Sequence, residues 1–293
     1  MITKNPNVAI CYNKDMKRLM LAVLMCVLSF GVVGGQVLAA PRTVAKDPIG
    51  YDISWPQCGK RLPTNQAFGI VGVNGGLANN TNPCLSTQLT WANRSIGGAN
   101  QPLIQLYVNT ANPGGLGTAS WPVNNIDPAG NMSPNPFAQC DNSDSLACAW
   151  QYGWNRAVED NLQRFVPSAT TAGVNTSASA YTWWLDVETE NTWKSGSAFA
   201  MQSNVAVLEG MTAYFKQLGA KVGLYSTGLQ WSQIVGSAVS GTSNLNGLPN
   251  WRPSGASLNN AKANCSVEPL TAGGIISLTQ FVIKGLDNNY SCI

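Results

Sequence analysis

Residues 181–190 read YTWWLDVETE, an apolar run that turns into carboxylates within a few positions. Aromatic and β-branched residues in such a run are typical of a buried strand. Side chains alternate along a strand with a rise of about 3.3 Å per residue, so Asp186 and Glu188 share one face, with Cα atoms roughly 6.7 Å apart. Trp183 and Trp184 point to opposite faces, so at most one of them faces an interior. The chain has to fold around a strand that is buried along its length and acidic at its end.

Further strand-like runs, separated by loops of Gly, Asn and Pro, alternate with amphipathic helical stretches. The expected strands cover residues 49–54, 69–73, 103–109, 181–187, 222–225, 250–252 and 275–281. The expected helices cover residues 84–95, 145–165, 198–218 and 229–235. Repeated strand and crossover units favour a parallel α/β sheet, and at 293 residues a closed barrel is the simplest single domain. Residues 112–142 form a long loop that we expect to be a surface flap, pinned by Cys140, at the rim of that barrel.

The N-terminal segment has the pattern of an export signal. Basic residues precede an apolar run at 19–33, and a small-residue cleavage signal follows at 37–39. We therefore expect a secretory signal peptide over residues 1–39 and one domain over residues 40–293. A retained membrane anchor is the weaker alternative, because glycines interrupt the run and it is shorter than the roughly 20 apolar residues that a span needs. The predicted location is extracellular or cell-wall associated, with no stable membrane insertion after cleavage.

Charge and cysteine content limit the classes of partner and indicate the redox compartment in which the protein folds. Removing residues 1–39 takes away four basic residues and only one acidic residue, which leaves the domain formally neutral and argues against nucleic-acid binding. An even number of cysteines in an exported chain implies disulfides. Six cysteines permit fifteen pairings. The preferred pairing joins Cys58 with Cys84, Cys140 with Cys148 and Cys265 with Cys292. No metal site or cofactor is predicted, since the chain has no histidine and no C-x-x-C pair.

The absence of histidine also leaves carboxylates as the natural acid and base candidates. Glycoside hydrolysis needs a carboxylic acid to protonate the leaving oxygen and a carboxylate to stabilise or attack the anomeric carbon. Asp186 and Glu188 can divide these roles. The alternative interpretation is a strand end whose acids cap the next helix or pair with a base. A peptidase lacks support, because no histidine is present for a triad or a zinc ligand.

Two further acidic strand ends accompany this pair. The first strand ends in DISWPQ from Asp52, and the last runs from Gln280 toward Asp287. In this order and spacing the chain resembles glycoside hydrolase family 25, the lysozyme-like muramidases. That family carries a D-x-S-x-W-Q type motif on its first strand, D-x-E on its fourth and an aspartate near an asparagine at its end. The resemblance covers residues 50–288.

The resemblance implies a single irregular TIM-like (β/α) barrel, with about five strand and helix units and a few consecutive strands. It implies cleavage of β-1,4 glycosidic bonds of peptidoglycan or a related glycan by a monomer. Glu188 would be the general acid, and Asp186 would orient or stabilise the reacting sugar, polarising its N-acetyl group if that group is the nucleophile. Asp52 and Asp287 would complete the acidic floor.

The chain also departs from the family pattern. Pro56 interrupts the first motif, and amides stand at Asn74 and Asn109 where the family tends to carry other polar groups, an acid in the first case. These departures favour an alternative function, a non-catalytic cell-wall carbohydrate-binding or scaffold protein on a degenerate barrel. Tryptophans stack well on sugars, although any single one more often packs in a core. The candidate substrate-binding residues are Trp55, Asn74, Asn109, Trp193, Tyr225 and Gln280.

Overall fold

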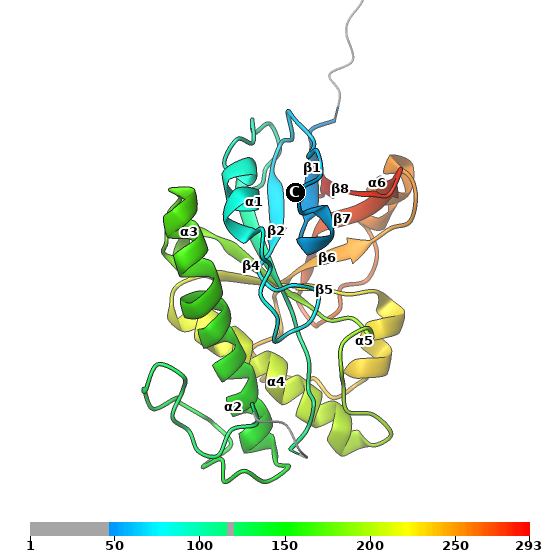
Figure 1. Cartoon of the computed structure of the whole chain (residues 1–293). Helices are drawn as coiled ribbons and strands as arrows, with labels where there is room; N and C mark the ends of the chain where they lie inside the picture. The colour runs from blue at the N-terminus through cyan, green and yellow to red at the C-terminus, as the bar shows by residue number, and fades with distance from the viewer. Residues whose placement is uncertain (1–46, 116–119) are drawn as a thin grey trace, which may run out of the picture. The chain divides into compact units, whose positions relative to one another are not determined.

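The computed structural model describes residues 47–115 and 120–293, so the predicted signal peptide lies outside the described residues. In this part of the chain eight strands form one closed barrel in chain order (Figure 1). The strands are β1 (Ile49–Ile53), β2 (Gly69–Gly72), β3 (Ile104–Asn109), β4 (Thr182–Asp186), β5 (Lys221–Tyr225), β6 (Pro249–Pro253), β7 (Ile275–Ile283) and β8 (Leu286–Ser291). Neighbours from β1 to β7 are parallel. The predicted class, an irregular α/β barrel, is confirmed.

Strand β8 closes the barrel and was not predicted. It runs antiparallel to both β7 and β1. A two-residue turn joins it to β7, with positive φ at Lys284 (54°) and Gly285 (72°). Two central residues with positive φ match the twist of a tight hairpin. The expected final strand at 275–281 is therefore one arm of a hairpin, and the segment around Asp287 is the other.

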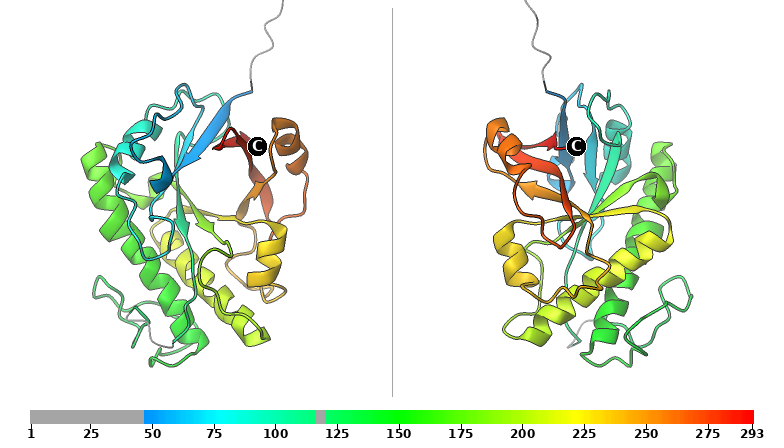
Figure 2. Two further views of the ribbon diagram at one scale, coloured as in Figure 1. Left: turned by 45° about the vertical axis from the view of Figure 1, so that its right-hand side comes forward. Right: turned by 180° about the vertical axis from the view of Figure 1, so that it is seen from behind.

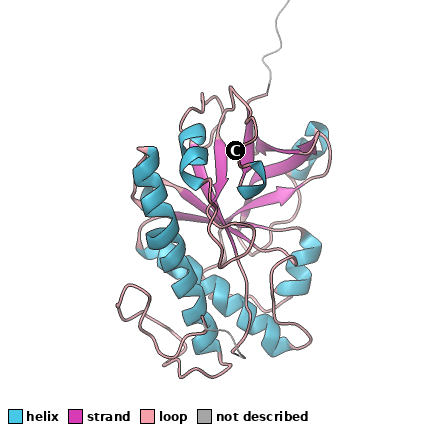
Figure 3. Cartoon of the chain, in the orientation of Figure 1, coloured by secondary structure: helices cyan, strands magenta, loops and turns pink. Residues whose placement is uncertain are grey.

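Helices cover the outside of the barrel (Figures 2 and 3). They are α1 (Leu85–Ala92), α2 (Leu146–Glu159), α3 (Val166–Ala172), α4 (Ala198–Gln217), α5 (Gly228–Ile234) and α6 (Leu258–Asn264). The expected helix at 145–165 continues through a π-helical segment, η2 (Asp160–Phe165), into α3. Helix α6 was missed, although Ser257 caps it by accepting a hydrogen bond from the Asn260 N–H at 3.2 Å. No helix in residues 47–115 or 120–293 has both the length and the apolar character needed to cross a membrane.

Helices α2 and α4 pack directly on each other through two glycines. A Cβ added to Gly153 would lie 1.9 Å from the Val207 carbonyl oxygen, and one added to Gly210 would lie 2.0 Å from the Trp150 carbonyl oxygen. The obstacle is backbone in both cases, so the helices can approach this closely only because both positions lack a side chain. This contact fixes α2, and with it the long loop that precedes it.

The apolar side chains form two layers. The outer one lies between the strands and the helices and contains Trp183, while the inner one fills the barrel and contains Trp184. The two tryptophans therefore face opposite sides of β4, as expected. Space for the inner ring comes from Gly223 on the neighbouring strand, where a Cβ would lie 2.3 Å from the Trp184 ring.

Three disulfides join the cysteines in the preferred pairing, Cys58–Cys84, Cys140–Cys148 and Cys265–Cys292. The second attaches the long loop to the first turn of α2 and pins it at Cys140, as expected. In Figure 1 this loop lies beside the start of α2, toward the end of the barrel at which the parallel strands finish.

We expect Gly210→Ala to destabilise the fold by about 3 kcal/mol, because the new methyl group meets backbone that cannot move aside. In an unobstructed helix interior, a Gly→Ala change stabilises the fold by about 1 kcal/mol. The sign of the change in unfolding free energy therefore distinguishes the two cases. Urea unfolding followed by near-ultraviolet circular dichroism measures it. Gly241→Ala is the matched control, because an added Cβ there meets nothing within 4 Å. A neutral or stabilising Gly210→Ala would contradict the close helix contact.

Candidate active site

Four carboxyl groups gather at the end of the barrel where the parallel strands finish. Asp52 of β1 is directly opposite Asp287 of β8 in the antiparallel register, so the two side chains share a face. Asp186 ends β4, and Glu188 follows it by two residues. Burial differs within the group, since Asp52 and Asp186 are only 7% and 6% exposed while Glu188 and Asp287 are half-buried. The structure thus brings together the acids that the sequence places on three separate strands.

A chain of hydrogen bonds orients Asp52. The Asn289 amide donates to Asp52 Oδ1 at 2.6 Å, and Gln280 Nε2 donates to both Asp52 oxygens at 3.1 Å. The Tyr225 hydroxyl in turn donates to Gln280 Oε1 at 2.9 Å, which fixes the orientation of that amide. Two of the predicted substrate-binding residues, Tyr225 and Gln280, therefore support an acid of the site.

The electrostatic environment favours protonated carboxyl groups. Burial, followed by the charge of Asp287, raises the pKa of Asp52 to about 7, although the hydrogen bonds from Asn289 and Gln280 act in the opposite direction. Burial, followed by the negative charge of Glu188, raises the pKa of Asp186 well above its usual range. The pKa of Glu188 is also raised, by burial and then by Glu190. A group of this kind retains protons near neutral pH, which acid catalysis requires.

Aromatic side chains form the floor beneath the acids. The Trp251 ring packs against Tyr225, Trp184 and Tyr107, with centroid distances of 4.4, 5.9 and 6.3 Å. All four rings belong to or pack on the inner apolar layer. These rings lie on β3, β4, β5 and β6, and apolar packing of this kind contributes to the desolvation that raises the carboxyl pKa values.

Hydroxyl groups that sequence reasoning missed hold the end of β4. Thr110 Oγ1 donates to the Asp186 carbonyl at 2.6 Å, and Ser226 Oγ donates to the Val187 carbonyl at 2.7 Å. Thr110 and Ser226 each come one residue after the end of a neighbouring strand, β3 and β5. The sequence predicted both strand ends correctly, so a hydroxyl residue directly after each end was the signal that could have found them. Trp193 Nε1 donates to the Glu188 carbonyl at 2.8 Å, so this predicted substrate-binding residue also fixes the backbone of an acid.

The two predicted asparagines have different surroundings. Asn109 is opposite Asp186 in the parallel register and so lies beside it. Asn74 is fully buried and does not join the four acids. Its Oδ1 accepts from the Asn109 N–H at 2.6 Å, and its Nδ2 donates to Asp160 at 2.9 Å. Its hydrogen bonds join the end of β2 to β3 and to the helical layer.

Trp55 is 49% exposed in the short 3-10 turn η1 (Trp55–Gln57) after β1. It lies against Gly76, where an added Cβ would come within 2.5 Å of the indole Nε1. The residue inserted into the first motif, Pro56, occupies the same turn. In the described residues no group of three or more acidic or cysteine side chains is arranged to hold a metal ion.

Comparisons with known proteins bear on the segment that carries two of the acids. Residues 159–263 match the model of a family described as Lysozyme-like protein 1. This stretch resembles lysozyme-like proteins. It includes Asp186 and Glu188 and extends from the end of α2 to α6, and it agrees with the resemblance drawn from the sequence. No curated protein matches the chain.

Two solved structures are similar to this chain. One is the modular Cpl-1 endolysin complexed with a peptidoglycan analogue, at 18% identity and a TM-score of 0.45. The other is the multimodular pneumococcal cell wall endolysin from phage Cp-1 complexed with choline, at 16% identity and a TM-score of 0.45. Each comparison covers 84% of this chain and 54% of the endolysin, so the chain spans about half the length of these proteins.

The raised carboxyl pKa values predict a stability that falls as pH rises. In the folded protein these groups hold protons that the unfolded chain loses near pH 4. Their contribution is therefore fully present below that pH and is lost as pH rises through the folded pKa values, which for Asp52 is about 7. We expect Asp186→Asn, which removes one buried titratable carboxyl group, to raise stability at pH 8 by about 1 kcal/mol and to flatten the decline between pH 5 and pH 8.

Thermal unfolding at a series of pH values measures this effect. Glu268→Gln is the matched control, because it removes a carboxylate from an exposed position outside the group. Equal melting curves for wild type and Asp186→Asn at pH 8 would show that neither burial nor the neighbouring acids destabilise the Asp186 carboxylate.

Proposed function

We propose that the chain is a secreted glycoside hydrolase that cleaves β-1,4 glycosidic bonds of peptidoglycan by carboxylate acid/base catalysis. The observation that carries the proposal is the pair Asp186 and Glu188, which lies above an aromatic floor with the pKa values of both acids raised. The match of residues 159–263 to a lysozyme-like family supports it. A carboxyl group whose pKa is raised, next to further carboxylates, is what glycosidic bond cleavage requires.

The exposure of each acid suggests its role. Glu188 is half-buried and so is accessible to a glycan, which suits the general acid that protonates the bridging oxygen. Asp186 lies deeper and orients the reacting sugar by polarising its N-acetyl group, which then acts as the nucleophile. Asp52 and Asp287 are the other two acids of the site. Gln280 and Asn289 hold Asp52 by hydrogen bonds.

Other residues would contact the glycan or position these acids. Trp55 is the most exposed of the candidate platforms, and Asn109 lies next to Asp186 at the strand end. Trp193, Tyr225 and Gln280 act mainly through the groups that they hold. The hydrogen bonds of Asn74 within the fold make it a supporting residue.

The second candidate is a non-catalytic protein that binds cell-wall carbohydrate on the same barrel. The observation that favours it is Asn74, an amide bound within the fold at a position where the resembled family tends to carry an acid. Under this reading the protonated carboxyl groups would only donate hydrogen bonds to the glycan. The two candidates differ in turnover and not in binding.

The cellular setting is part of the proposal. Three disulfides suit an oxidising compartment and hence an extracellular or cell-wall location. The segment 1–39 would direct export and then be removed. We propose a monomer that acts on a glycan and has no nucleic-acid partner.

Reducing ends released from purified peptidoglycan measure the proposed activity. We expect the full chain with its disulfides formed to release them, and Glu188→Gln to lower the rate by 10² to 10⁴, about the contribution of a general acid. Glu268→Gln is the matched control and should keep the wild-type rate, because that carboxylate is exposed and outside the site.

The comparison separates the two candidates. Activity that is present in the wild type and in Glu268→Gln but lost in Glu188→Gln, with binding to the wall retained, supports the hydrolase. No release by the wild type from several wall types, with binding unchanged in both forms, would overturn the hydrolase in favour of the binding protein.

A further inference from the structure

Four charged side chains pack together where helix α2 passes into the π-helical segment η2. They are Arg156, Glu159, Asp160 and Arg164, and we call them the ionic cluster. Arg164 Nη1 donates to Asp160 Oδ1 at 2.8 Å, and Glu159 pairs with both arginines. Asp160 is fully buried, and both arginines are buried as well. Replacing a buried ion pair with apolar side chains of similar size is often neutral or stabilising, so stability alone does not account for this cluster.

Asp160 determines the direction of the Asn74 side chain. Asn74 Nδ2 donates to Asp160 Oδ1 at 2.9 Å, and Arg164 donates to the same oxygen, which keeps that oxygen an acceptor. An amide group can present either its NH₂ or its oxygen to a neighbour, and an acceptor selects the NH₂ end. The Asn74 oxygen is therefore left to accept from the Asn109 N–H, which it does at 2.6 Å.

The end of β3 is held by this amide. The paired part of β2 ends at Gly72, and the Asn74 side chain continues the pairing by accepting from Asn109. The next residue is Thr110, whose N–H and Oγ1 both donate to the Asp186 carbonyl, at 3.1 and 2.6 Å. The hydrogen bonds of Asn74 and those of Asp186 thus meet at two consecutive residues of the chain.

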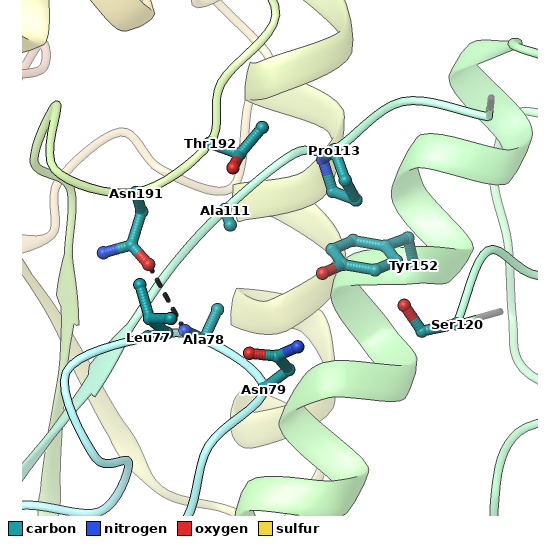
Figure 4. A pocket seen from close by; sticks show the side chains of 9 residues that line it. All are labelled: Leu77, Ala78, Asn79, Ala111, Pro113, Ser120, Tyr152, Asn191 and Thr192. Carbon is teal, nitrogen blue, oxygen red and sulfur yellow. Dashed lines mark hydrogen bonds between the residues drawn. The ribbon is translucent and has the colours of Figure 1, made fainter. Parts of the chain in front are cut away.

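A second branch leads to Glu188 through the loop after β2, which lines the cavity drawn in Figure 4. Arg164 Nη2 donates to the Asn79 carbonyl at 3.2 Å. One residue earlier, the Ala78 N–H donates to Asn191 Oδ1 at 3.3 Å, the dashed line in Figure 4. The Asn191 N–H in turn donates to the Glu188 carbonyl at 3.4 Å. The ionic cluster is therefore connected to the backbones of both proposed catalytic acids.

We propose that Asp160 is a positioning residue, which holds Asp186 in place for the reaction through the Asn74 amide and the end of β3. We call the hydrogen bonds that link Asp160, Asn74 and Asn109 the relay. A misplacement of about 1 Å can lower the rate of a reaction by roughly 10²-fold, so a group outside the barrel can matter to the chemistry. Asp160 is also the first residue of η2, and π-helical turns are frequent at functional sites.

This inference rests on the proposed function for the reaction that Asp186 performs, whereas the relay can be measured without turnover. Amide hydrogen exchange of the full chain, followed by NMR, is the measurement. Asp160→Ala removes the acceptor of the Asn74 amide. We expect it to speed exchange of the Asn109 amide proton about five-fold relative to the amides of β7, the effect of one lost hydrogen bond. Comparison with β7 removes any uniform loss of stability, because that strand lies outside the relay.

Two further variants separate the hydrogen bond from the charge. Asp160→Asn removes the same negative charge but keeps an oxygen in the place of Oδ1, so it should preserve the slow exchange of Asn109. Glu159→Gln is the matched control, because it weakens ion pairs of the same cluster and leaves the partner of the Asn74 amide in place. Asn109 should exchange at its wild-type rate in this control.

The hydrolysis assay then tests the positioning role. We expect Asp160→Ala to lower kcat by roughly 10- to 100-fold with KM little changed, because Asp160 is fully buried and does not contact the glycan. Asp160→Asn should recover most of that loss, and Glu159→Gln should keep the wild-type kcat. A thermal melt of each variant verifies folding.

The outcomes separate this inference from the proposed function. Equal exchange of Asn109 in Asp160→Ala and the wild type overturns the relay, and so does an equal effect of Asp160→Ala and Asp160→Asn. Faster exchange without loss of kcat in an active enzyme overturns the positioning role. A wild type that releases no reducing ends refutes the hydrolase alone, because the exchange result needs no turnover.

The test does not depend on the folding of Asp160→Ala. If that variant does not fold, the wild type and Asp160→Asn decide. An Asn109 amide proton that exchanges slowly in both supports the relay. One that exchanges in the wild type as fast as the amides of exposed loops, or that loses its protection in Asp160→Asn, overturns it.

Discussion

The desolvation of acids at one end of a closed barrel is the constraint on which the rest of the site depends. Trp251 packs against three other aromatic rings of the inner apolar layer, and Asp52 and Asp186 at this end of the barrel are themselves buried. Carboxylates in such a place are costly unless they are protonated or hydrogen-bonded. Asp52 meets the second condition through the amides of Gln280 and Asn289. The pKa of Asp186 is raised by burial and by the neighbouring Glu188, which favours the first.

The antiparallel strand β8 makes this arrangement possible. It lies between β7 and β1, so it supplies both Asp287, which faces Asp52, and Asn289, which binds it. A barrel closed by β7 alone would lack both groups. The antiparallel strand is therefore part of the site. It carries Asp287, one of the four acids, and Asn289, which donates a hydrogen bond to Asp52.

Much of this could be predicted from the sequence, for physical reasons that also explain the failures. The buried strand at 181–187 and its two acids follow from alternation, and the opposite orientation of Trp183 and Trp184 is confirmed. Strand β8 was missed because its inward positions are polar, which hides the apolar alternation by which strands are recognised. Asn74 lies two residues beyond the end of β2, where alternation no longer determines direction, and its partner Asp160 is distant in the sequence. Sequence patterns predict which side chains each strand directs to either face, whereas contacts between distant loops appear only in three dimensions.

The central claim is that buried acids in this barrel retain protons near neutral pH, and their carboxyl carbons report this directly. A ¹³C NMR titration of the full chain, labelled at the side-chain carboxyl carbons of Asp and Glu, measures each midpoint. The account predicts that Asp52 titrates with a midpoint near 7 and that Asp186 titrates well above its usual range. Midpoints below about 5 for every carboxyl group, as in freely hydrated side chains, would contradict it.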